Sequence, residues 1–130
     1  MEQAQQIRAW RLNFDSSAPI YSQIIANFAR AIVREELHIG ERIPSIRDLA
    51  TELKVNTNTV ARAYQEMERD GLIYSQRGTG YFVMESNELR ATLKEQMLSK
   101  AVEAFFAEMH SLGFTNSEIK EIIVKEADKS

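Results

Sequence analysis

The sequence predicts a mainly α-helical protein with one small β-hairpin. Two short helical patterns, residues 45–53 and 56–70, are separated by only Lys54 and Val55. Two short β-rich stretches then flank the glycine-containing turn "QRGTG", and helical patterns fill the last third of the chain. With a further helix before the first pair, this order is that of a winged helix-turn-helix followed by a C-terminal helical hairpin.

Composition is ordinary for one soluble globular domain, with 130 residues, 44% hydrophobic and 27% charged. There is no cysteine, which excludes disulfides, thiolate metal sites and a cysteine nucleophile. The N-terminal stretch "MEQAQQIRAWRLNF" lacks the apolar run of a signal peptide, and no segment approaches the roughly 18 apolar residues of a membrane span. We therefore expect a soluble, cytoplasmic protein.

The formal net charge of −3 at first argues against a polyanionic partner. Basic and acidic residues balance in residues 1–40 and again in residues 41–84, whereas residues 85–130 carry six basic and nine acidic residues. The negative charge is thus confined to the last third. The middle third is neutral as a whole, but its arginines lie at the helix starts and turns discussed below.

The first sizeable helix is expected to begin at Pro19, because proline lacks the N–H that a first helical residue leaves unpaired. Gly40 is the predicted stop. Between them, apolar residues recur close to the helical period, at Ile20, Ile24, Phe28, Ala31, Ile32 and Leu37.

The next two helices have clear start signals. Ser45 can cap the first, with Asp48 three residues on as a short capping box, and Asn56 can cap the second. Gly71 is predicted to end the second helix. Residues 72–74 and 81–83 are the predicted strands, and the two glycines between them suit a hairpin loop.

Residues 85–130 predict a long helix and a second, shorter one. The long helix has an apolar stripe and is closed by Gly113, while Thr115 and Glu118 form a capping box for the second. The stripe consists of Leu89, Leu93, Met97, Ala101, Phe105 and Met109, widened by Leu98, Val102, Phe106 and Leu112.

The stretch "VNTNTV" places more small polar residues at a helix start than capping needs. Asn56 suffices as the cap, which leaves Thr57, Asn58 and Thr59 as spare polar groups. In a helix-turn-helix the second helix enters the DNA major groove with its N-terminal residues nearest the bases. Arg62 lies one turn beyond Asn58, on the same face. A plain surface helix with a polar first turn is the alternative, but the neighbouring helix and hairpin favour DNA contact.

Two further arginines occupy positions suited to DNA phosphates. Arg47 lies in the first turn of its helix, where the helix dipole disfavours a cation unless an external anion is present. Its alternative is a solvated side chain or a pair with Asp48 or Glu52. Arg77 lies at the hairpin tip beside Gly78, where the backbone can approach a phosphate or the minor groove closely. Its alternative is an ordinary arginine on a tight hairpin.

The segments "PIYSQI", "GERIPSIRDLATEL", "VNTNTVARAYQEMERDGLI" and "RGTGYFV" together resemble the GntR family of bacterial transcription regulators, and the short tail resembles its YtrA-type subfamily. The resemblance implies a homodimeric repressor that binds a palindromic double-stranded DNA operator. Thr57 departs from the family, in which proline or arginine is common there. The DNA contacts that the family implies fall on Ser45, Arg47, Asn56, Thr57, Asn58, Thr59, Arg62, Arg77 and Gly78.

The predicted domains are therefore a DNA-binding winged helix-turn-helix over residues 8–84 and a two-helix dimerisation region over residues 85–130. Two helices cannot enclose a sizeable cavity alone, but paired with a second copy they can bury a large apolar area. An unidentified small-molecule effector at that interface is an alternative role for Phe105, Phe106 and Met109. The predicted dimer contacts are Leu98, Val102, Phe105, Phe106 and Met109.

An enzyme is not expected. His38 and His110 lack metal-ligand spacing, and we find no catalytic triad, phosphate-binding loop or zinc motif, so no cofactor or metal is predicted. The alternative from another class is a winged-helix protein–protein adaptor without nucleic-acid binding, which the arginines and the hydroxyl-rich helix start disfavour. The head of a longer aminotransferase-like regulator is also disfavoured, because the sequence shows no second domain.

Overall fold

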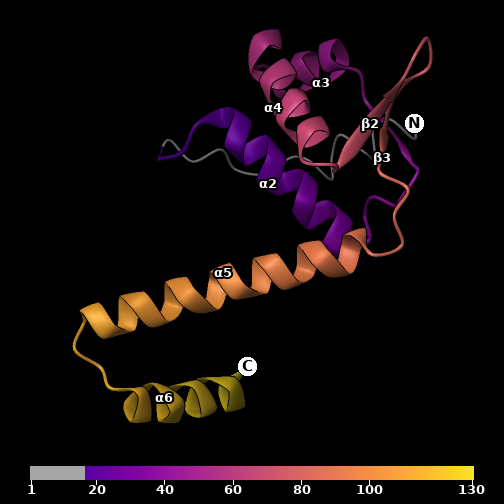
Figure 1. Cartoon of the computed structure of the whole chain (residues 1–130). Coiled ribbons are helices and arrows are strands. Elements are labelled where there is room, and N and C mark those ends of the chain that lie inside the picture. Colours follow the sequence, from indigo (N-terminus) through magenta and orange to yellow (C-terminus); the bar gives the residue numbers. More distant parts are fainter. Residues whose placement is uncertain (1–16) are drawn as a thin grey trace. The chain divides into compact units, whose positions relative to one another are not determined.

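The computed structural model describes residues 17–130 and has a mainly helical architecture with one small sheet, as predicted (Figure 1). The chain divides after Leu93 into two compact units. No helix in residues 17–130 has an apolar stretch long enough to cross a bilayer. The elements are α2 (Ile20–Val33), β1 (Arg42–Ile43), α3 (Ile46–Leu53), α4 (Thr57–Arg69), β2 (Ile73–Gln76), β3 (Gly80–Val83), α5 (Leu89–Ser111) and α6 (Asn116–Lys129).

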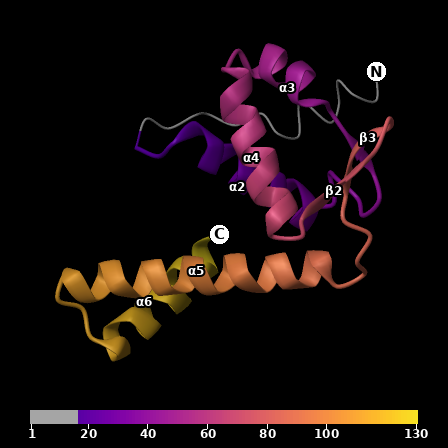
Figure 2. The same cartoon turned by 45° about the horizontal axis from the view of Figure 1, so that its top comes forward.

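In the N-terminal unit, α4 packs against both α2 and α3 and leads directly into the sheet (Figure 2). Each of these helices turns one apolar face inward, as its helical period predicts. The core also takes in Leu89 and Leu93, so the first turns of α5 belong to this unit. The division at residues 84 and 85 stays a prediction, and residues 8–16 lie outside the described residues. The fully buried side chains include Ile24, Phe28, Ile32, Leu37, Leu49, Val60, Tyr64, Met67, Ile73 and Val83.

The predicted limits of the first helix were wrong at both ends. Pro19 has an extended ψ of 142° and is the N-cap, one residue before the helix. The helix ends at Val33, and Glu35 adopts a left-handed φ of 62°. The amide of Glu36 then donates to Ala31 O at 2.8 Å, which closes the end in a Schellman motif without glycine. This turn lets Leu37 bury without continuing the helix.

The helix-turn-helix itself was predicted correctly. Ser45 Oγ accepts from the amide of Asp48 at 3.1 Å, and Asn56 Oδ1 accepts from the amide of Asn58 at 2.7 Å. Lys54, with a φ of 57°, makes the left-handed turn between α3 and α4. Gly71, with a φ of 78°, ends α4, as its position predicted.

The hairpin was predicted, but β1 was missed. β1 pairs antiparallel with β3, and Arg42 lies opposite Phe82, so the sheet has the order β1-β3-β2. A strand of only two residues carries no alternating pattern that could reveal it in the sequence. Its effect is to tie the segment before α3 to the hairpin.

The C-terminal unit contains the rest of α5 and α6, which folds back along it (Figure 1). Gly113, with a φ of 91°, lies in the connection, as predicted. The capping box is complete, because the amide of Thr115 donates to Glu118 Oε1 at 2.9 Å and the amide of Glu118 donates to Thr115 Oγ1 at 3.2 Å. Ile119 of α6 is fully buried within this unit.

The capping box predicts a titration result. Hydrogen bonds from Thr115 hold the pKa of Glu118 below its ordinary value. Since the folded pKa is depressed, its contribution to stability is present above the unfolded pKa and is lost as pH falls through the folded pKa. Because the backbone amide of Thr115 gives the largest part of this effect and Thr115→Ala keeps that amide, we expect this variant to raise the Glu118 pKa only part of the way to its ordinary value. NMR titration of the side-chain carboxyl would measure this, and a full return to the ordinary value would contradict the assigned order of causes.

Candidate nucleic-acid interface

The predicted binding residues lie on three neighbouring parts of the N-terminal unit: the start of α3, the start and outward face of α4, and the β2–β3 turn. Figures 1 and 2 show α3 and the β2–β3 turn at the same end of this unit. The start of α4 follows α3 after one tight turn, so it lies at that end as well.

The start of α4 separates the capping residue from spare polar groups. The Asn56 side chain is used as the cap, whereas the side chains of Thr57 and Asn58 are exposed and make no hydrogen bond within residues 17–130. Thr59 is half-buried at the edge of this surface. The free amide and hydroxyl groups are short enough to reach bases or phosphates without holding the helix away.

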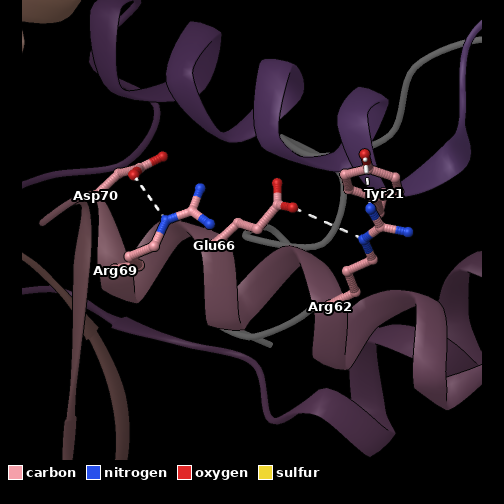
Figure 3. A network of polar contacts seen from close by, with 5 residues as sticks. All are labelled: Tyr21, Arg62, Glu66, Arg69 and Asp70. Carbon is pink, nitrogen blue, oxygen red and sulfur yellow. Dashed lines mark hydrogen bonds and ion pairs between the residues drawn. The ribbon is translucent and has the colours of Figure 1, made fainter.

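A shallow open groove follows the outward face of α4, opposite its buried residues. Arg62 is paired with Glu66 at 3.7 Å, and Arg69 with Asp70 at 3.2 Å (Figure 3). Gln65 and Arg69 were missed in the sequence, although each lies two helical turns after a predicted contact and so shares its face. The groove is lined by Asn58, Ala61, Arg62, Gln65, Glu66 and Arg69.

Arg47 is exposed on the first turn of α3, as predicted. Within residues 17–130 its guanidinium has no hydrogen-bond or ion-pair partner, so neither Asp48 nor Glu52 neutralises it. A cation at the positive end of a helix dipole, with no protein counter-charge among the described residues, is a suitable ligand for an external anion.

The β2–β3 turn presents Arg77 and Gly78 at its tip. The amide of Thr79 donates to Gln76 O at 2.9 Å, and Gly78 takes a φ of 77° that glycine adopts without strain. Arg77 is exposed and has no charge partner in the described part of the chain. Arg42 of β1, which the sequence analysis did not single out, extends along this hairpin, because its Nε lies 3.3 Å from where a Cβ on Gly80 would be.

Tyr64 fixes the three parts to one another. Its hydroxyl donates to Pro44 O at 2.6 Å, directly before the α3 cap, and its ring packs edge-on against Tyr81 of β3 at 4.9 Å. Burial raises the Tyr64 pKa far above its ordinary value, so the hydroxyl remains a donor at any physiological pH. Tyr64 of α4 thereby contacts both the start of α3 and the β2–β3 hairpin.

We expect Tyr64→Phe to lower the free energy of unfolding by about 1–3 kcal/mol, because it leaves a buried carbonyl without its donor. Thermal and denaturant unfolding would measure this. Tyr81→Phe is the matched control, since the Tyr81 hydroxyl makes no hydrogen bond within residues 17–130 and its loss should change stability by less than about 0.5 kcal/mol. Equal effects of the two substitutions would contradict the role given to the Pro44 bond.

The two histidines are part of local contacts. His38 Nδ1 lies 3.2 Å from Glu41 Oε1, and His110 Nε2 lies 2.6 Å from Asn116 Oδ1. Among residues 17–130 no group of three or more histidine, aspartate or glutamate side chains is arranged to hold a metal ion. The candidate surface described above is built mainly from cations and neutral polar groups, with Glu66 as the acidic residue that lines the α4 groove.

Comparison with known proteins agrees with this fold. Residues 20–83 match the family described as bacterial regulatory proteins, gntR family. The HTH-type transcriptional regulator YhcF of Bacillus subtilis is 42% identical over 108 residues, which cover 83% of this chain and 89% of that protein. The HTH-type transcriptional repressor YtrA of the same organism is 36% identical over 98 residues, which cover 71% of this chain and 75% of that protein.

A solved GntR family transcriptional regulator from Listeria monocytogenes superposes with a TM-score of 0.79 at 37% identity, covering 86% of this chain and 98% of that one. The similarities to YhcF and to the Listeria regulator cover more of the chain than the N-terminal unit contains, so they extend into the C-terminal helices. They agree with the separate signals read from the helix caps, the polar start of α4 and the hairpin. The chain belongs to the GntR family of bacterial transcription regulators, and its winged helix-turn-helix is a DNA-binding domain.

Proposed function

We propose that this regulator binds a palindromic operator as a homodimer and represses transcription by occluding a promoter. The observation that carries the proposal is the set of polar and cationic side chains at one end of the N-terminal unit that have no partner among the described residues. Thr57, Asn58, Arg47 and Arg77 are exposed and available to DNA. Repression is supported by the name of the Bacillus subtilis relative YtrA, a transcriptional repressor.

In the proposed binding mode the start of α4 enters the major groove. There, Asn56 keeps the helix capped while Thr57 and Asn58 meet base edges, and Arg62 follows on the same face. Arg47 and the α3 start, with Ser45 as its cap, bind phosphate or an adjacent base. The Arg77–Gly78 turn contacts the neighbouring backbone or minor groove. Thr59, being half-buried, lies at the edge of this contact.

The C-terminal unit supplies the proposed dimer contact. Leu98, Val102 and Phe105 of α5 expose 56%, 45% and 40% of their surfaces. They form an apolar strip whose contact with water is unfavourable. Phe106 and Met109 are half-buried and adjoin this strip: the Phe106 ring contacts that of Phe105, and Met109 lies one helical turn beyond Phe105. A second copy related by a two-fold axis presents the same strip, so the two could cover each other.

A dimer with this arrangement would place its two recognition helices about 34–36 Å apart, in successive major grooves. The test is selection from a randomised duplex pool at two salt concentrations, followed by sequencing. We expect a palindrome with half-sites about 10 base pairs apart and affinity that falls steeply with salt. A single unpaired half-site would contradict the dimer. Recovery of no sequence would contradict operator reading and favour the protein–protein adaptor.

A further inference from the structure

We infer that Tyr21 is a positioning residue for operator recognition, which acts by holding the guanidinium of Arg62 at the DNA-facing surface. This inference rests on the proposed function, because it assigns a task to Arg62 within that interface. Tyr21 lies in the first turn of α2, outside the helix-turn-helix, and 41 residues from Arg62 in sequence. It therefore adds a third helix to the reading surface.

Two contacts join the side chains (Figure 3). Arg62 Nη2 donates to the Tyr21 hydroxyl at 3.1 Å, and Arg62 Cζ lies 3.9 Å from the centroid of the Tyr21 ring. The ring thus lies against the guanidinium, and the hydrogen bond to the hydroxyl keeps the guanidinium from turning over the ring. A stacked and hydrogen-bonded arginine has far fewer conformations than one that extends freely from a helix.

Tyr21 is suited to this task because the turn that carries it is held firmly. The amide of Ser22 donates to Pro19 O at 3.1 Å, and Gln23 Nε2 donates to Ala18 O at 2.8 Å. Ile24, which lies about one helical turn after Tyr21, is buried in the core. The tyrosine ring is therefore a fixed surface against which a mobile side chain can be ordered.

Glu66 also lies near Arg62, but its contact is weaker. Arg62 Nε and Glu66 Oε1 are 3.7 Å apart, and the arginine side chain is 60% exposed, so water and salt screen this pair. Arginine has five N–H donors, and Tyr21 takes one of them. The others remain for a phosphate or for the acceptors of a guanine, and their direction is set mainly by the tyrosine.

The advantage of this arrangement lies in pre-organisation. An arginine that must be ordered when DNA binds loses side-chain entropy at that moment, whereas one already held by Tyr21 loses less. The order also favours one geometry of contact over others, so Tyr21 should affect which sequences are bound as well as how tightly.

The experiment is a double-mutant cycle on the full chain and its selected operator, with Tyr21→Phe and Tyr21→Leu each made alone and with Arg62→Ala. We expect Tyr21→Phe to weaken binding about threefold and Tyr21→Leu about tenfold. In the Arg62→Ala background neither should weaken binding further. Repeating the sequence selection with Tyr21→Leu should show relaxed preference at the half-site position that Arg62→Ala also relaxes.

Tyr74→Phe is the matched control, since the Tyr74 hydroxyl donates to Glu85 Oε1 at 2.8 Å and belongs to no proposed DNA contact.

An equal loss with and without Arg62 would overturn the inference, because Tyr21 would then act directly on DNA or through the fold. Full affinity in Tyr21→Leu would overturn it too. Unaltered binding by Arg62→Ala would remove both this inference and the Arg62 contact, while selection of a palindrome by the unmodified chain would still uphold the proposed function. Tyr21→Phe retains the ring and keeps the cycle decisive if Tyr21→Leu does not fold.

Discussion

Replacing Val102 and Phe105 with aspartate is expected to convert the proposed dimer into a folded monomer and to weaken operator binding about 100-fold or more. Both side chains are exposed on α5, so the substitutions add charge to the proposed contact without entering a core. Each buried carboxylate would have to lose its hydration or be neutralised, which an apolar interface cannot compensate. Losing the second DNA-binding head removes the gain from simultaneous binding of two half-sites, which is typically about 10²–10⁴ in affinity.

Sedimentation velocity over a range of concentrations would measure the mass, and a binding titration would measure the affinity for a full operator and for an isolated half-site. Circular dichroism should show unchanged helicity. Ala107→Asp is the matched control, because Ala107 is exposed on the side of α5 away from Val102 and Phe105. A double variant that still sediments as a dimer would exclude this strip as the interface. A monomer that binds the full operator as tightly as before would separate dimerisation from operator affinity.

The parts of the fold that follow from local chemistry were predictable. Ser45, Asn56 and Thr115 each cap a helix as their side chains allow, and Gly71 ends one as its freedom at positive φ allows. The end of α2 was not predictable in this way. Glu35 takes a left-handed conformation that glycine usually occupies, and the turn is stabilised by its surroundings: Arg90 Nε donates to Val33 O at 3.0 Å from the start of α5.

The candidate site likewise has parts that the sequence predicts and parts that only the folded structure reveals. The polar start of α4 and the cation at the start of α3 can be identified from sequence, since helix geometry fixes where they point. The sequence could not show that Arg47 lacks a protein partner among the described residues while Arg62 has two, because the difference depends on which side chains meet in space. Tyr21 illustrates this: nothing in "PIYSQI" indicates that its ring supports an arginine of α4.

Arg47→Ala is expected to weaken operator binding by about 1–3 kcal/mol if the guanidinium reads a base. The absence of a partner in the described residues makes this variant informative, since no ion pair is broken and no buried group is exposed. Stability should therefore stay within about 0.5 kcal/mol of the unmodified protein. The fall in affinity would then report on DNA contact alone.

The salt dependence and the sequence preference distinguish the two contacts that Arg47 could make. A phosphate contact predicts an equal loss on all sequences and a salt slope lower by about one, whereas a base contact predicts relaxed preference at one position of each half-site. Arg34→Ala is the matched control: it removes the same charge at the C-terminal end of α2, where Arg34 Nε pairs with Glu36 Oε1 at 3.0 Å. If both variants weaken binding equally, the effect comes from net charge and Arg47 is not a contact. If only Arg47→Ala does, the start of α3 is part of the interface, and the unpaired cation at a helix start has the anionic partner that its position requires.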